Sequence, residues 1–182
     1  MVEALELFRH GALLAMLIIC VYTDLAKGKI YNGVTLPGLL AGLAVAFMLQ
    51  GAAAYRPEFR GEFAASLTAA ALGGGTLFVI YLFGGFGAGD VKLMAAIGAL
   101  CADWRLTLLA LLYSAVIGAA LAVGVLVWKG RLLEGLRRSA RLLFTFRRVA
   151  RKIEAREEIF LPYGFAISAG TLWAWLQWLP KM

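Results

Sequence analysis

Charged residues and metal-binding residues are scarce in this chain of 182 residues, and their scarcity excludes several classes of protein. Only 16% of the residues are charged, whereas soluble domains carry about a quarter. Cys20 and Cys101 each lie in an apolar run without a CxxC partner, and His10 is the single histidine. Activated thiols and metal centres need specific neighbours that are missing here. We therefore predict buried, unreactive cysteines, a structural histidine, and no metal or cofactor.

Hydrophobic residues make up 62% of the chain, which has a mean hydropathy of +0.82. They occur in blocks rather than in alternation, the pattern that lipid selects. We predict an all-α polytopic membrane protein of about six transmembrane helices, with residues 1–182 forming one domain. Residues 1–10 lack the basic start of a secretory signal, so we expect the first helix to remain in the mature protein. The predicted spans are 11–23 (which could extend back through 5–8), 34–49, 63–83, 91–102, 106–128 and 159–179.

The runs 11–23 and 91–102 are shorter than the roughly 20 residues of a full crossing. Thirteen residues make about 20 Å of helix, against about 30 Å of hydrocarbon. If these helices end or begin below the membrane surface, Asp24 and Asp90 lie in a recess facing the bundle interior. Ordinary interfacial carboxylates on loops are the alternative, and spacing alone does not separate the two.

Ten of the 18 basic residues fall in 129–156, between the fifth and sixth predicted spans. Positively charged loops stay in the cytoplasm. With six spans, Asp24 and Asp90 then lie on the same cytoplasmic face, and both termini lie outside.

The basic segment 129–158 has apolar residues near helical spacing with arginines between them. This pattern is typical of an amphipathic helix that lies on anionic lipid. The segment could instead serve as a topology anchor alone, or bind a partner. The charge is confined to one juxtamembrane stretch, so we predict no nucleic-acid binding.

The chain has three aspartates, and two of them lie in unusual surroundings. Asp90 ends the glycine-rich run 84–90 at the predicted start of a helix, where the helix dipole and Lys92 favour its ionised form. Two carboxylates in one site keep a proton between them, so one can activate water while the other polarises a carbonyl. Alternatively, Asp90 merely caps its helix. Asp103 has no comparable setting and is interpreted as interfacial.

Three segments resemble motifs of the type IV prepilin peptidases, and they follow one another in the family order. Residues 87–93 (GAGDVKL) are similar to the GxGD-V-K-L signature, residues 24–32 (DLAKGKIYN) to the D-x5-I-P-N motif, and residues 161–167 (LPYGFAI) to a proline–aromatic–glycine motif. Tyr31 departs from the family, which usually has proline there.

The resemblance implies an aspartyl endopeptidase of the inner membrane that removes the leaders of prepilins or pseudopilins, without a cofactor. It makes Asp24 and Asp90 the catalytic pair. The short length resembles members that serve tight-adherence (Flp-type) pili and lack a methyltransferase domain. The supporting residues that it implies are Gly87, Gly89, Lys92, Asn32, Pro162, Tyr163 and Gly164.

Two other functions remain open from the sequence. A presenilin-like intramembrane protease would share the GxGD run, but such proteins have more spans and a Pro-Ala-Leu motif where this chain has 162–164. A small transporter or channel would use intramembrane carboxylates to relay protons or bind cations.

Overall fold

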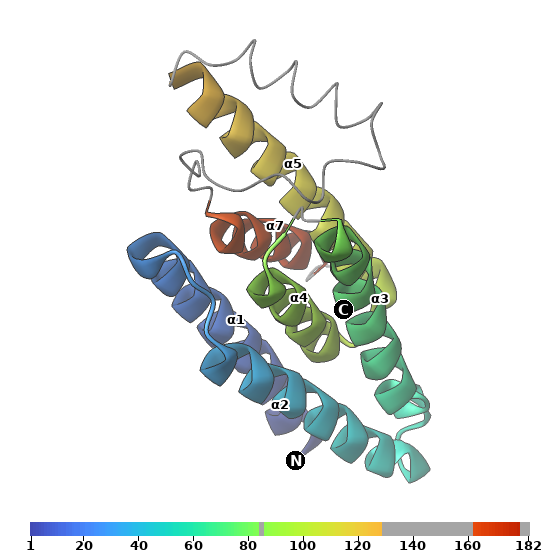
Figure 1. Ribbon diagram of the computed structural model, residues 1–182. Helices are drawn as coiled ribbons and strands as arrows, with labels where there is room; N and C mark the ends of the chain where they lie inside the picture. Colours follow the sequence, from blue (N-terminus) through green and yellow to red (C-terminus); the bar gives the residue numbers. More distant parts are fainter. Residues whose placement is uncertain (84–85, 129–161, 179–182) are drawn as a thin grey trace.

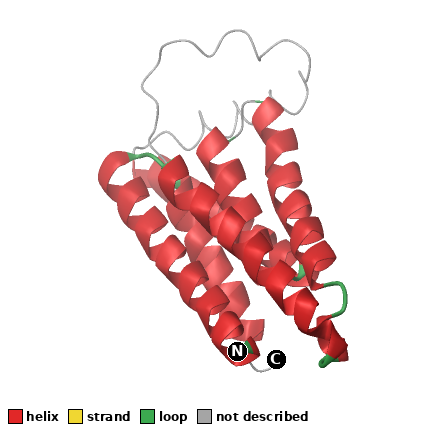
Figure 2. Ribbon diagram, turned by 90° about the horizontal axis from the view of Figure 1, so that it is seen from below, coloured by secondary structure: helices red, strands yellow, loops and turns green. Residues whose placement is uncertain are grey.

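The computed structural model describes residues 1–83, 86–128 and 162–178, which form helices and short connections (Figure 1). These ranges contain no β-strand, so the predicted all-α class is confirmed (Figure 2). Two short 3-10 helices, η1 (Ala52–Ala54) and η2 (Pro57–Phe59), connect α2 to α3. The helices are α1 (Val2–Lys27), α2 (Asn32–Gly51), α3 (Glu62–Leu82), α4 (Ala88–Cys101), α5 (Trp104–Trp128) and α7 (Tyr163–Trp178).

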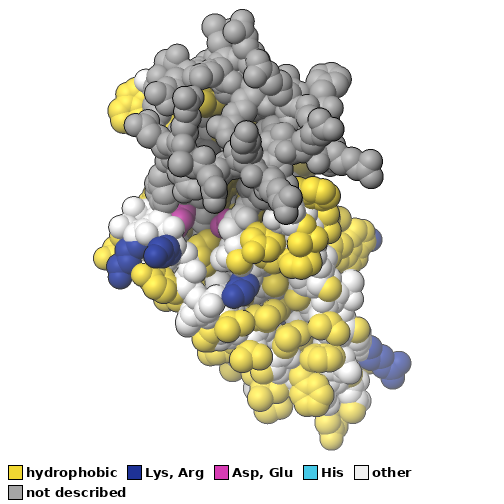
Figure 3. Space-filling view, viewed as in Figure 1, with side chains coloured by type: hydrophobic (Ala, Val, Ile, Leu, Met, Phe, Trp, Pro, Cys, Tyr) yellow, Lys and Arg dark blue, Asp and Glu magenta, His cyan; other side chains and the backbone are white. Residues whose placement is uncertain are grey.

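Four helical stretches are long and apolar enough to cross a membrane: Val2–Lys27, Asn32–Ala54, Pro57–Leu82 and Trp104–Trp128. Large apolar side chains are exposed along these stretches, and hydrophobic side chains cover much of the described part of the face drawn in Figure 3. Helix α4 has 14 residues and the described part of α7 has 16. At about 1.5 Å per residue, both are shorter than a hydrocarbon core of about 30 Å. The predicted count of six spans is therefore not confirmed. The basic segment 129–158 and the start of the predicted sixth span lie outside the described residues.

Helix α4 is the most enclosed helix of the bundle, because eight of its last nine residues are buried. Glycines let its neighbours approach closely. A Cβ built on Gly98 would collide with the carbonyl of Ala69 on α3, and one on Gly42 of α2 would lie 2.6 Å from the carbonyl carbon of Ala99. Gly73 and Gly74 of α3 pack against α4 in the same way, whereas a Cβ on Gly75 would meet open space.

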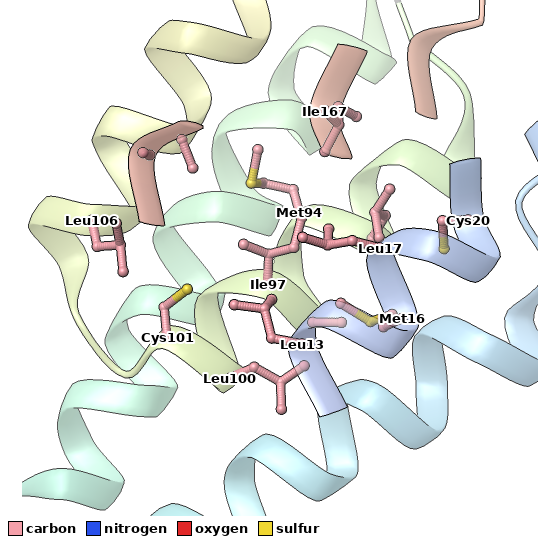
Figure 4. Close-up of a cluster of buried hydrophobic side chains, with 14 of the residues drawn as sticks. Leu13, Met16, Leu17, Cys20, Met94, Ile97, Leu100, Cys101, Leu106 and Ile167 are labelled. Atoms are coloured by element: carbon pink, nitrogen blue, oxygen red, sulfur yellow. The ribbon is translucent and has the colours of Figure 1, made fainter. Parts of the chain in front are cut away.

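Side chains of α1, α3, α4, α5 and α7 form the main core. Figure 4 shows Leu13, Met16 and Leu17 of α1 converging with Met94, Ile97 and Leu100 of α4, while Leu106 of α5 and Ile167 of α7 complete the cluster. Cys20 and Cys101 belong to this core as free, buried thiols, which is the state predicted for them.

Polar contacts join distant segments of the chain at one end of the bundle. Arg9 near the start of α1 forms an ion pair with Glu62 at the start of α3 (3.1 Å). Near the end of α7, Trp175 Nε1 donates to Nδ1 of His10 (3.3 Å), which gives the histidine the structural role predicted for it. The other end of the bundle therefore contains the C-terminal end of α1 and the starts of α2, α4 and α7. Both Asp24 and Asp90 lie there.

Candidate active site

Asp24 lies in the last turn of α1, because that helix continues to Lys27 rather than ending at Asp24 as predicted. The helix ends at Gly28, whose positive φ of 62° suits glycine and whose N–H donates to the carbonyl of Asp24 (2.8 Å). At 26 residues α1 is not a short span, so the recess does not arise from its length. It arises from packing, since Asp24 is only 5% exposed.

The start of α7 holds the carboxylate of Asp24. The N–H of Phe165, in the first turn of α7, donates to Asp24 Oδ2 (3.0 Å) across 141 residues of sequence. Helix N-termini have free N–H groups and a partial positive charge, so they stabilise an anion there. Gly164 makes the approach feasible, because a Cβ at that position would lie 2.9 Å from Asp24 Oδ2.

Asp90 lies in the first turn of α4, as predicted from the glycine-rich run, and outside the four candidate spans. Its Oδ2 accepts the N–H of Gly87 (2.9 Å), and its own N–H donates to the carbonyl of Gly87 (3.1 Å). Only 6% of Asp90 is exposed. Burial raises the pKa of Asp90 to about 6, the Gly87 N–H opposes this, and the nearby carboxylate of Asp24 adds to it. The two carboxylates therefore influence each other.

Two apolar contacts join the three motif segments around the aspartates. Ile30, in the connection between α1 and α2, lies against both Gly89 and Gly164: a Cβ on either glycine would be 3.0 Å from an Ile30 carbon. The rings of Phe86 and Tyr163 lie 5.1 Å apart between centroids. The residues before Asp90 and the residues at the start of α7 are thus held in one site with the end of α1.

Lys92 and Asn32 form a second polar link at this end of the bundle. Lys92 Nζ donates to Asn32 Oδ1 (2.9 Å), which joins α4 to the start of α2. We expected the helix dipole and Lys92 to favour the ionised form of Asp90, but burial has the larger effect and raises the pKa of Asp90 instead. That part of the electrostatic expectation is wrong.

The remaining predicted positions have simple backbone roles. Tyr31 is the N-cap of α2 with φ −87° and ψ 134°, close to the polyproline conformation that a proline would favour, and Lys27 Nζ lies 5.6 Å from its ring centroid. The carbonyl of Pro162 accepts the N–H of Ala166 (3.3 Å) in the first turn of α7. Asp103 follows the other end of α4 and accepts the N–H of Arg105 (2.7 Å), so it is remote from Asp90.

Sequence reasoning missed Ile30, Phe86 and Phe165 as members of the site. Ile30 was within a recognised motif, and it is the single aliphatic side chain between Lys27 and Asn32. The other two occur beside motif glycines, but their contacts run between distant segments and leave no local pattern.

The arrangement has the components of acid–base hydrolysis. Two neighbouring buried carboxyl groups favour a state in which one keeps its proton and the other is ionised, so such a pair can supply both an acid and a base. The three residues before Asp90 are Gly87, Ala88 and Gly89, and such small residues allow another backbone to approach closely.

Comparison with known proteins identifies one related group. The sequence profile of the type IV leader peptidase family matches residues 11–123, which is more than half of the chain and includes both Asp24 and Asp90. The segment 162–164 lies beyond the matched residues, although the structure brings it against Asp24. No curated protein and no solved structure gives a significant match.

Proposed function

The chain belongs to the type IV leader peptidase family, and we propose that it cleaves the leaders of Flp-type prepilins or pseudopilins on the cytoplasmic side of the inner membrane. Family membership makes the protein an aspartic peptidase of the prepilin peptidase type. The proposal adds the substrate, the side of the membrane, and the catalytic pair Asp24 and Asp90. It also takes residues 1–182 as one membrane peptidase domain without methyltransferase activity.

One observation supports the catalytic pair above all others. Asp24 and Asp90 are both buried at the same end of the bundle, and each is held by an amide at a helix start. Burying two carboxyl groups together is costly unless one keeps its proton. A protein that only needed two helix caps could use serine, threonine or asparagine without that cost.

We propose the following chemistry for the pair. The ionised carboxylate removes a proton from water as the water oxygen attacks the scissile carbonyl, while the protonated carboxyl donates a hydrogen bond to the carbonyl oxygen. Collapse of the tetrahedral intermediate breaks the C–N bond, and a carboxyl proton passes to the leaving amine. The products are the leader with a new carboxylate and the mature chain with a new amino terminus.

The other motif residues have supporting roles in this proposal. Gly87 and Gly89 shape the backbone before Asp90, and Gly164 admits the Asp24 carboxylate. Asn32 and Lys92 hold α2 to α4, while Pro162 and Tyr163 start α7 against the glycine-rich loop. The segment 129–158 is proposed to contact anionic lipid, and no nucleic acid is involved.

Cleavage by the purified protein tests this function against a transporter. In detergent, where no ion gradient exists, the protein should cut a prepilin once, between its basic leader and its apolar helix, as measured by mass spectrometry. With S-adenosylmethionine present, the new amino terminus should stay unmethylated. The matched control carries both Asp24→Asn and Asp90→Asn. Ion flux through the protein in liposomes, with no cleavage in detergent, would support the transporter and refute the proposal.

Reporter fusions test the proposed orientation. Because positive loops remain in the cytoplasm, fusions within 129–156 and in the connection between α1 and α2 should report a cytoplasmic position, and a fusion before Val2 should report the outside. A cytoplasmic signal from the amino terminus would contradict the orientation.

A further inference from the structure

Ile30 touches the backbone supports of both aspartates. It lies in the connection between α1 and α2, and part of it packs on the main core. A Cβ built on Gly89 would be 3.0 Å from Ile30 Cβ and 3.7 Å from its Cγ2, whereas one built on Gly164 would be 3.0 Å from its Cδ1. The branched side chain therefore faces Gly89 with its base and Gly164 with its tip.

Each of these glycines lies beside one of the two carboxylates. Gly89 immediately precedes Asp90 in the first turn of α4. Gly164 immediately precedes Phe165, whose N–H binds Asp24 Oδ2, and its own backbone lies against that oxygen. Since both contacts are close, neither helix start can move towards the other without displacing Ile30.

We propose that Ile30 is a positioning residue that sets the spacing of Asp24 and Asp90; this inference rests on the proposed peptidase function. The interaction between two carboxyl groups depends on their separation and on the local dielectric constant. The protons of such a pair dissociate in two steps that belong to the pair. Ile30 acts on both the separation of the carboxyl groups and the local dielectric constant, because it occupies the space between the helix starts and keeps water out of it.

The test compares three variants of the full-length protein in a prepilin cleavage assay. Ile30→Ala keeps the Cβ beside Gly89 but removes Cγ2 and the Cδ1 that faces Gly164. It should lower kcat about tenfold to a hundredfold with little change in KM, because it disturbs catalytic geometry rather than substrate binding. Ile30→Val keeps Cβ and Cγ2 beside Gly89 and loses only the Cδ1 that faces Gly164, so its loss of kcat should be smaller than that of Ile30→Ala. Val45→Ala is the control, since Val45 is buried with Leu49 and Phe59 near the opposite end of α2.

The pH profile of kcat distinguishes positioning from a general loss of stability. Ile30→Ala should shift at least one limb of the profile, because water beside the pair changes their coupling. Val45→Ala should leave both limbs in place, even if its melting temperature falls as far. A profile of Ile30→Ala that superimposes on the wild-type profile overturns the inference, whatever happens to kcat. Failure of the wild-type protein to cleave any prepilin would instead refute the proposed function.

Discussion

Replacing either Asp24 or Asp90 by asparagine should abolish leader cleavage while the protein still inserts and purifies normally. Loss of one member of a catalytic unit lowers kcat by about a thousandfold or more in enzymes whose residues act together. Asparagine has nearly the shape of aspartate, but it cannot accept and release the proton that this hydrolysis requires. Cleavage of a purified prepilin by each purified variant measures the effect.

The structure makes asparagine the informative substitution. Asp24 accepts the N–H of Phe165, and Asp90 accepts the N–H of Gly87. An asparagine side-chain oxygen can accept the same hydrogen bonds, so both helix starts remain capped. Alanine would remove the cap together with the charge and would confuse the two roles.

Stability provides a readout of the fold that is independent of activity. Burial raises the pKa of Asp90 from 3.8 to about 6. The contribution of Asp90 to the stability of the fold is therefore complete below its pKa in the unfolded chain, 3.8, and is lost as the pH rises through about 6. Above that pH, Asp90→Asn removes a buried negative charge, so its melting temperature in detergent should equal or exceed that of the wild type.

Two further variants complete this prediction. Because the pair acts as a unit, the double variant should be scarcely less active than either single one. Asp103→Asn should retain most activity, since Asp103 caps the start of α5 far from Asp90. Substantial cleavage by a folded Asp90→Asn or Asp24→Asn protein would refute the two-aspartate mechanism.

Substituting Gly164 by alanine should lower cleavage about a hundredfold without preventing insertion. The added Cβ would lie 2.9 Å from Asp24 Oδ2 and 3.0 Å from both Asp24 Cγ and Ile30 Cδ1. Such distances force the carboxylate or the start of α7 to move, and a displacement of about 1 Å in a catalytic group can cost a hundredfold in rate. Steady-state cleavage of a prepilin measures kcat and KM separately, and the loss should appear in kcat.

Gly75→Ala is the matched control for this substitution. Gly75 is also helical, but a Cβ there meets no atom within 4 Å. Alanine favours helix over glycine, so this variant should be at least as stable as the wild type and cleave at its rate. Equal activity of Gly164→Ala and Gly75→Ala would show that the contact with Asp24 does not matter to the reaction.

The sequence alone determined the class of this protein and the identity of its candidate residues. Long apolar runs predicted an all-α membrane protein, and the predicted spans 63–83 and 106–128 agree within two residues with α3 and α5. The three motifs predicted which residues would meet. Local composition is sufficient for the class, because a residue's preference for lipid depends on neighbours along the chain, whereas the candidate residues came from the resemblance of three short motifs to a known family.

Only the tertiary structure decided how the aspartates are held. The sequence indicated that the run 91–102 is short, but an apolar run is equally suited to lipid and to a protein interior, so it could not show that α4 is enclosed by its neighbours. The bond from Phe165 to Asp24 joins residues 141 positions apart, and Ile30 touches two glycines from other segments. Contacts of this kind depend on how the helices pack, and packing has no signature in local composition.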